Sequence, residues 1–154
     1  MFLRSPYLLT LVSVIMAVHL PTASARQGVI AGPVEAEIIR VIDGDTVLVA
    51  AKPWPSQSVT TYVRLRGIDA PEMKDRCPAM RDAAHRAHEA LTKLLQNSPS
   101  IFLTEISGDK YYGRILADVR LPNGDDPADK LMQSGLVVRY DGGKKIRPIC
   151  PQTQ

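Results

Sequence analysis

Aromatic residues are scarce in this chain of 154 residues, and no internal repeat or low-complexity segment interrupts it. Aromatic side chains make up only 5% of the residues, so a folded core is expected to be mainly aliphatic. The formal net charge of +3 is too small to indicate nucleic-acid binding by itself. The length and the hydrophobic fraction of 45% are typical of a single globular domain.

Motifs of several common enzyme and metal-binding classes are also missing. The sequence has no G-x-S-x-G and no H-E-x-x-H, which disfavours a serine hydrolase and a zinc protease. The stretch "GDKYYGR" (108–114) contains G-x-x-x-x-G but no following Lys-Ser/Thr, so it is not a P-loop. Counting from Asp43, the twelfth residue is Trp54 and not an acid, which excludes an EF-hand loop.

A long hydrophobic run is absent, and the longest apolar segment lies near the start of the chain. "YLLTLVSVIMAV" (7–18) is shorter than the roughly 20 residues that span a bilayer. Arg4 before it and the small residues at 23–25 fit a secretory signal peptide. We therefore predict a cleaved signal at 1–25 and a secreted or periplasmic domain at 26–154, without stable membrane association. An uncleaved membrane anchor is the alternative.

Cysteine is limited to two residues, Cys77 and Cys150. An even number of cysteines in an exported protein suggests one disulfide, which would tie the tail to the loop after "DAPEMKDR". Closing a loop of this size stabilises a fold by about 3–5 kcal/mol in the chain-entropy model. Two free thiols are the alternative. A zinc site is disfavoured because no other Cys or His lies nearby at ligand spacing.

The residues that are present form alternating strand and helix patterns. Val- and Ile-rich segments predict strands over 34–42, 46–51, 59–67, 100–106 and 114–121. Helical spacing predicts an amphipathic helix over 79–96, and Asp126 and Gly135 bound a short second helix over 127–134. Residues 136–140 are expected to return as an extended segment. Three strands, a helix, two strands and a helix is the order of an OB-fold, a five-stranded Greek-key barrel, so the predicted class is α+β and mainly β.

Acidic residues occur at two of the predicted turns. Asp43 and Asp45 flank Gly44, which is expected to let the chain turn sharply through a positive φ, and Asp69 and Glu72 follow the third strand. Clustered carboxylates repel one another unless a cation lies among them. Their oxygen ligands suit Ca²⁺ or Mg²⁺. Acids that only cap backbone N–H groups of the turns are the alternative.

Two arginines could accompany these acids. Arg64 lies on the strand before the second acidic turn, and Arg114 ends the "GDKYYGR" loop. The planar guanidinium group binds phosphate through two parallel hydrogen bonds. Arg66 and Arg120 are interpreted as residues of solvent-exposed strand faces. Acids for a metal, a further glutamate and two arginines form a set suited to phosphodiester hydrolysis.

The loop between the last two predicted strands combines a cation with aromatic rings. Lys110, Tyr111 and Tyr112 could contact the phosphates and bases of a single-stranded nucleic acid. An ordinary polar hairpin loop would have a similar composition.

Four stretches in the same order resemble the staphylococcal nuclease (thermonuclease) family. They are "VIDGDTV" (41–47), "VRLRGIDAPE" (63–72), "DKYYGRILA" (109–117) and "LMQSGLVVRY" (131–140). The resemblance implies an OB-fold barrel and a Ca²⁺-dependent endonuclease that hydrolyses phosphodiester bonds in DNA and RNA. It is expected to be a monomer that prefers single strands.

The resemblance also implies a role for each matched residue. Asp45 and Asp69 match the calcium carboxylates, Thr46 and Ala70 the positions that complete the metal shell, Ala70 through its carbonyl, and Asp43 a supporting acid. Arg64 and Arg114 match the two transition-state arginines, and Glu72 matches the general base. Lys110, Tyr112 and Tyr140 match substrate contacts.

The chain departs from the family pattern in two places. "DKYYGR" is one residue longer than the usual Asp-Lys-Tyr-Gly-Arg, which leaves the register of Lys110 and Tyr111 open. The segment after Tyr140 lacks a long charged helix, and a Cys77–Cys150 bond is inferred to pin the tail instead. The rival hypothesis is a non-catalytic OB-fold module that binds nucleic acid or a protein. Degenerate members of that kind should lose a key acid or arginine, whereas every such position is filled here.

Overall fold

The computed structural model describes residues 28–145 and 149–150, so the predicted signal peptide lies outside the described residues. The strands are β1 (Val34–Val41), β2 (Thr46–Lys52), β3 (Val59–Leu65), β4 (Gly67–Asp69), β5 (Ser100–Gly108), β6 (Arg114–Arg120) and β7 (Val138–Tyr140), and the helices are α1 (Pro78–Leu95) and α2 (Pro127–Gln133). Neither of these helices has the length and apolar character needed to cross a membrane.

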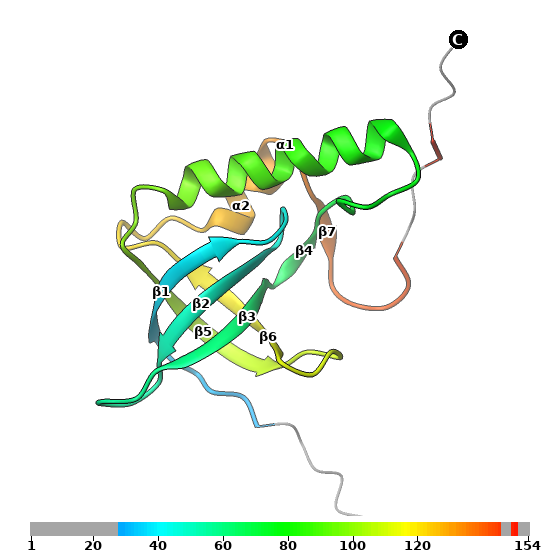
Figure 1. The fold of residues 1–154 in the computed structure, drawn as a ribbon. Helices are drawn as coiled ribbons and strands as arrows, with labels where there is room; N and C mark the ends of the chain where they lie inside the picture. The colour runs from blue at the N-terminus through cyan, green and yellow to red at the C-terminus, as the bar shows by residue number, and fades with distance from the viewer. Residues whose placement is uncertain (1–27, 146–148, 151–154) are drawn as a thin grey trace, which may run out of the picture.

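Five strands close into a barrel in the order β1-β2-β3-β6-β5 (Figure 1). Short turns join β1 to β2 and β2 to β3, so these neighbours pair in antiparallel fashion. Helix α1 carries the chain away from the meander before the β5–β6 hairpin, and β6 then pairs parallel to β3 and closes the barrel. This topology confirms the OB-fold predicted from the order of the elements.

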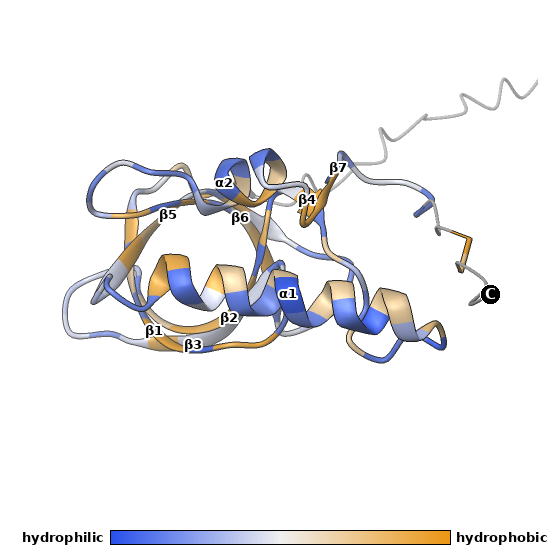
Figure 2. Ribbon diagram, turned by 90° about the horizontal axis from the view of Figure 1, so that it is seen from above, coloured by the Kyte–Doolittle hydropathy of each residue, from blue (hydrophilic) through white to orange (hydrophobic). Residues whose placement is uncertain are grey.

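The interior of the barrel is aliphatic, as the composition predicts. Along β2, the side chains of Val47, Val49 and Ala51 are buried at alternate positions, which is the period of a strand with one face inward. Among the described residues, no Phe, Tyr or Trp belongs to the buried core. Orange, hydrophobic stretches therefore mark the barrel strands in Figure 2.

Helix α1 lies across one end of the barrel (Figure 1) and presents small side chains to it. Ala84 and Ala87 are buried in the middle of the helix, and Leu91 and Leu95 are buried further along the same face. Because alanine is short, the helix can approach the turn between β1 and β2 closely. Blue and tan segments alternate along α1 in Figure 2, as expected for an amphipathic helix.

The strand predicted over 59–67 is divided into two. β3 ends at Leu65, and Gly67 redirects the chain into β4. The φ of Gly67 is +81°, a backbone conformation that residues with a Cβ rarely adopt. β4 pairs with β7, so that Gly67 lies opposite Tyr140 and Asp69 opposite Val138. This pairing brings the C-terminal segment beside the second acidic turn.

Arg66 differs from its interpretation as a solvent-exposed residue. Its side chain is half-buried and donates hydrogen bonds to the carbonyl oxygens of Glu105 and Leu116, and it pairs with Asp118 at 3.2 Å. The bend between β3 and β4 turns this side chain over the β5–β6 hairpin. A strand-period argument could not find this orientation, because it assumes that the strand continues.

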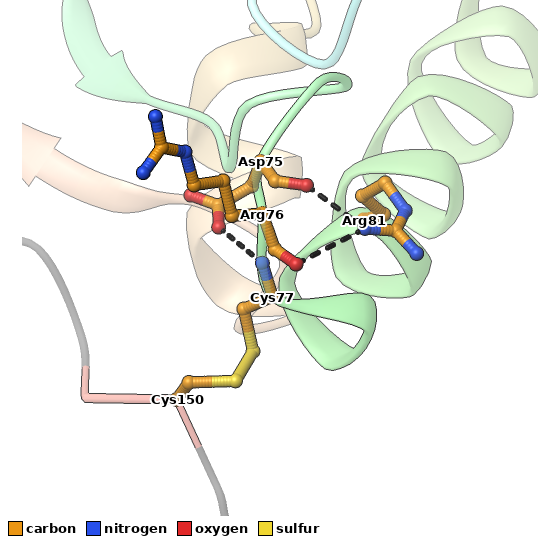
Figure 3. Close-up of a disulfide and its surroundings, with 5 residues drawn as sticks. All are labelled: Asp75, Arg76, Cys77, Arg81 and Cys150. Atoms are coloured by element: carbon orange, nitrogen blue, oxygen red, sulfur yellow. Dashed lines mark hydrogen bonds between the residues drawn. A yellow bond between two sulfur atoms is a disulfide. The ribbon is translucent and has the colours of Figure 1, made fainter.

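The predicted disulfide between Cys77 and Cys150 is present (Figure 3). Cys77 is buried and immediately precedes α1, and its backbone N–H donates to Asp75 Oδ1 at 2.8 Å. Arg81, on the first turns of α1, donates to the carbonyl oxygens of Asp75 and Arg76. The tail is therefore bonded to a hydrogen-bonded corner at the start of a long helix.

Cys150→Ser is expected to lower the stability of the fold without altering the barrel. The bond joins residues 73 apart in sequence, for which the chain-entropy model gives about 4 kcal/mol. Urea unfolding of the parent and the variant would measure the difference, with the reduced parent as the matched control. A parent whose unfolding midpoint does not change on reduction would contradict the prediction.

Candidate functional site

A cleft of about 760 Å³, which many charged side chains line, opens beside the end of β3. Three parts of the chain line it: the turns and strands that carry the predicted acids, the loop between β5 and β6, and the segment that follows β7. Of the residues singled out in the sequence, the cleft is lined by Asp43, Asp45, Arg64, Arg66, Ala70, Glu72, Lys110, Tyr111, Arg114 and Tyr140. Thr46, Asp69 and Tyr112 are not among its lining residues. The fold thus gathers residues that are up to 97 positions apart, from Asp43 to Tyr140.

Asp45 is the most deeply buried acid of this cleft, with 2% of its surface exposed. Its Oδ1 accepts hydrogen bonds from Arg64 Nη1 at 2.6 Å and from Thr46 Oγ1 at 2.9 Å. Its Oδ2 accepts from the backbone N–H of Ala70 at 2.8 Å. Asp45 therefore ties the first acidic turn to the second.

The electrostatic state of Asp45 reflects its burial. Burial raises the pKa of the Asp45 carboxyl to about 6, because the cost of desolvating the carboxylate outweighs the attraction of Arg64. The neighbouring carboxylate of Asp43 raises the pKa further. Asp45 therefore lies in a place where additional positive charge would favour the ionised form.

Asp43 has the capping geometry of a turn residue. Its Oδ1 accepts from the backbone N–H of Asp45 at 3.0 Å, which is the two-residue spacing of an Asx turn. Asp43 therefore shapes the turn, as the capping interpretation expects, whereas Asp45 points into the buried corner.

Gly44 is required by packing and not by a positive φ, which corrects the sequence-based expectation. Its backbone φ lies outside the left-handed range. A Cβ at this position would lie 2.6 Å from the Cβ of Ala87 on α1 and 2.8 Å from the Cβ of Ala70. Helix α1 and the second acidic turn thus approach the backbone of Gly44 so closely that no side chain fits.

Gly44→Ala is therefore expected to destabilise the fold, by about 1–3 kcal/mol as an overpacked site. Ala87→Gly in the same chain should recover part of the loss, because it removes the closer of the two clashing methyl groups. Urea unfolding of the two single variants and the double variant would measure this coupling. Additive effects of the two substitutions would show that the contact with α1 does not explain Gly44.

Arg64 bridges the two acidic turns from β3. Its Nη2 donates to Asp69 Oδ1 at 2.5 Å and to the carbonyl oxygen of Ile68 at 3.3 Å, while Nη1 donates to Asp45. The guanidinium carbon lies 5.9 Å from the ring centroid of Tyr140, on β7. Each of the two acids is thus neutralised in part by the same cation, and the fork geometry of arginine makes this possible.

Lys145 is a cleft residue that the sequence did not reveal. Its Nζ lies 2.8 Å from Asp69 Oδ1 and 2.8 Å from Glu72 Oε1. Burial alone would lower the pKa of Lys145, but its hydrogen bonds to Asp69 and Glu72 outweigh this effect and the pKa is raised. The side chain of Glu72 is 67% exposed, so it lies at the rim of the cleft.

On the opposite side of the cleft, the β5–β6 loop carries a stacked group of side chains. Arg114 pairs with Asp109 through Nε, and its guanidinium carbon lies 4.7 Å from the ring centroid of Tyr111. Lys110 Nζ lies 5.2 Å from the same ring. Tyr111 lines the cleft, whereas Tyr112 is fully exposed and does not line it.

The structure shows which of the two adjacent tyrosines lines the cleft. In the described structure, Tyr111 and not Tyr112 is the tyrosine beside Arg114, although Tyr112 is the nearer of the two in sequence. Asp109 was not among the predicted site residues, and Tyr111 was considered as a nucleic-acid contact but was not matched to a family position. Their signal in the sequence was the alternation of acid, base and aromatic residues in the loop, which is too common to select one tyrosine over its neighbour.

The oxygen atoms of the acidic corner suit a hard divalent cation. Asp45 and Asp69 supply carboxylates that are bridged by one arginine, and the Thr46 hydroxyl lies beside Asp45. Within the described residues, no three His, Cys, Asp or Glu side chains are grouped closely enough to hold a metal by themselves. A cation here would thus rely on two carboxylates together with neutral oxygens, as Ca²⁺ sites allow.

The fold and this cleft are those of an OB-fold domain of the nuclease-like kind. The model of the staphylococcal nuclease homologue family matches residues 62–148, which is more than half of the chain. The chain therefore belongs to this family. The matched range includes Arg64, Asp69, Glu72 and Arg114, and it begins after Asp45. Among curated proteins, none matches the chain significantly.

Proposed function

We propose that this chain is a Ca²⁺-dependent endonuclease that hydrolyses phosphodiester bonds in DNA and RNA. The observation that carries the proposal is the convergence of Asp45, Arg64, Glu72 and Arg114 on one cleft. Acids that can hold a cation, next to two forked cations, are suited to a phosphate group whose charge increases during the reaction. The signal-like segment at 1–25 supports a secreted or periplasmic location.

Calcium would be held by the carboxylates of Asp45 and Asp69, with Thr46 and the carbonyl of Ala70 completing the shell. Asp43 would support the site by fixing the turn that carries Asp45. When bound, Ca²⁺ would polarise the phosphate group and offset its negative charge. With only two carboxylates the affinity should be modest, and Ca²⁺ should be preferred over Mg²⁺, which holds its water ligands more tightly.

The protein side chains supply the remaining chemistry. Glu72, at the rim of the cleft, would accept a proton from a water molecule as that water attacks the phosphorus atom. The bond between phosphorus and the leaving oxygen then breaks, and a proton from solvent neutralises the leaving group. Arg64 and Arg114 would stabilise the charge that develops on the phosphate oxygens. Within the described part of the chain, Arg114 donates to a protein acceptor through its Nε–H alone. Its two terminal nitrogens are therefore suited to binding phosphate oxygens.

The loop side of the cleft would bind the nucleotide. Tyr111 offers a ring on which a base can stack, and Lys110 offers a cation for phosphate. These contacts favour flexible single-stranded substrates, and the enzyme would act as a monomer. Tyr140, on β7, would contact the nucleotide from the opposite wall. Tyr112 points to solvent, so a contact with substrate through Tyr112 would involve strand outside the cleft.

One observation favours the second candidate, a non-catalytic module that binds nucleic acid or a protein. Arg64 is already bonded to both acids, and Lys145 bonds to Asp69 and Glu72. If these ion pairs persisted with substrate, the acids would be unable to hold a cation or accept a proton. Calcium binding therefore has to redistribute these contacts if the enzyme hypothesis is correct.

A gel assay separates the two candidates. The protein is incubated with denatured DNA, and separately with RNA, in the presence of Ca²⁺ or of a calcium chelator. The nuclease hypothesis predicts cleavage into fragments with Ca²⁺ and intact substrate with chelator. Intact substrate in both reactions, together with a salt-sensitive mobility shift, would identify the binding module and overturn the proposed activity.

A further inference from the structure

The segment after β7 returns to the cleft and places one of two adjacent lysines in it. Lys145 lines the cleft, and 32% of its side chain is exposed. Lys144 is exposed and does not line the cleft. The sequence "DGGKK" does not distinguish these two lysines, whereas the tertiary structure places only Lys145 in the cleft.

We propose that Lys145 is a phosphate-binding residue of the nucleic-acid cleft, held there by the tail that the Cys77–Cys150 bond tethers. The inference rests on the proposed function in one respect, namely that the ligand of the cleft is a nucleic acid. It adds a further cation to Arg64, Lys110 and Arg114, from a part of the chain outside the barrel.

The hydrogen bonding of Lys145 is compatible with a further anionic ligand. An ammonium group has three N–H donors, and Asp69 and Glu72 accept two of them. No third partner of Nζ is found among the described residues. In the absence of calcium, a phosphate oxygen can therefore bind to the third N–H while both carboxylates keep Lys145 in position.

A purely stabilising role explains the position of Lys145 poorly. The side chain of Glu72 is 67% exposed, and ion pairs with exposed partners contribute little to stability. The side chain of Asp69 is only 14% exposed, but its carboxylate is already paired with Arg64. Ordering the tail costs conformational entropy, especially at Gly142 and Gly143, whose φ values are +100° and +87°. Binding of a polyanion by Lys145 would explain why this segment is ordered at the cleft.

Two attachments restrict the tail on either side of Lys145. Tyr140 Oη donates to the carbonyl oxygen of Gly143 at 2.7 Å, which closes the turn that leads to Lys145. Beyond it, Cys150 is bonded to Cys77 at the start of α1. A chain of five residues spans at most about 18 Å, so Lys145 cannot lie further than that from Cys150.

The test is a binding measurement in chelator, so that no cleavage occurs. A fluorescent single-stranded DNA oligonucleotide is titrated with the parent, Lys145→Ala and Lys144→Ala at several salt concentrations. Each phosphate contact on a single strand contributes about 0.7 to the slope of log affinity against log salt. Lys145→Ala should bind more weakly, with a slope reduced by about 0.7, and Lys144→Ala, the matched control, should keep the parent slope.

Two further variants distinguish contact from tethering. Lys145→Arg keeps the charge and should retain the parent slope. Cys150→Ser should weaken binding and move the slope toward that of Lys145→Ala, because the lysine remains but is no longer confined. A barrel damaged by the substitution would show itself in the far-ultraviolet circular dichroism spectrum.

Equal slopes for Lys145→Ala and Lys144→Ala would overturn the proposal. Tighter binding by Lys145→Ala would overturn it as well, and would show that Lys145 shields the acids. If the parent binds DNA but the gel assay shows no cleavage, the nuclease hypothesis fails while the role of Lys145 is still decided. If the parent does not bind nucleic acid at any salt concentration, both proposals fail.

Discussion

Arg64→Lys is expected to lower the rate of phosphodiester cleavage by a factor on the order of 10²–10³, the effect of removing one preorganised donor. Arg64 uses two separate nitrogens to reach Asp45 and Asp69, at 2.6 and 2.5 Å. Lysine keeps the charge but has a single nitrogen, so it cannot bridge the two turns or offer a fork to phosphate. Arg114→Lys should cause a loss of similar size, because its fork is supported by Asp109 and by the ring of Tyr111.

Initial rates of cleavage of denatured DNA at saturating Ca²⁺ would measure both effects. Arg120→Lys is the matched control, since Arg120 pairs with Asp126 away from the cleft and should retain the parent rate. Glu72→Gln keeps the size of the side chain and removes its basicity, so it should also lower the rate. Rates within a few-fold of the parent for all three cleft variants would place the active site elsewhere, even if the protein is a nuclease.

Asp45→Ala is expected to abolish Ca²⁺-dependent cleavage, because it removes the buried carboxylate that receives Arg64, Thr46 and the backbone of Ala70. Removing one partner of a buried ion pair is also destabilising, by roughly 3–5 kcal/mol in well-packed cases. The pKa of Asp45 is raised by burial, so the loss here should be smaller than that. Asp45→Asn is the sharper variant, since it can still accept a hydrogen bond and carries no charge.

Calcium titration followed by calorimetry would measure the effect apart from cleavage. Both Asp45 variants should lose calcium binding, while Glu72→Gln should keep most of it, because Glu72 lies at the rim of the cleft. Asp125→Asn is the matched control, since Asp125 pairs with Lys130 and neither residue lines the cleft. Undiminished calcium binding and cleavage by Asp45→Asn would remove Asp45 from the proposed site.

The elements of the fold followed from local patterns. The β-branched runs, the helical spacing before Leu95 and the Asp126 cap are properties of neighbouring residues, and the structure confirms each within a few positions. The barrel followed from the order of these elements, since few topologies suit it. The pairing of Cys77 with Cys150 followed from their number.

The approach of the acids and arginines to one cleft was expected from motif spacing and from the resemblance, and the structure brings these residues together. Contacts between distant segments decided the rest. Gly44 lacks a side chain because α1 lies against it, and no feature of "DGD" indicates where a helix beginning 34 residues later will pack. Tyr111 lines the cleft and Tyr112 is exposed to solvent, which the sequence of the loop could not decide because the two tyrosines are adjacent.

Lys145 is the clearest case of a residue that only the tertiary structure could assign. Two adjacent lysines have identical side chains and the same secondary-structure propensity, so the sequence does not indicate which of them faces a cleft. The choice depends on the pairing of β4 with β7, on the turn closed by Tyr140 and on a disulfide to the start of α1. Local sequence thus determined the elements and the chemistry that they carry. Long-range packing determined which side chains share the site, because burial and charge pairing are properties of the assembled chain.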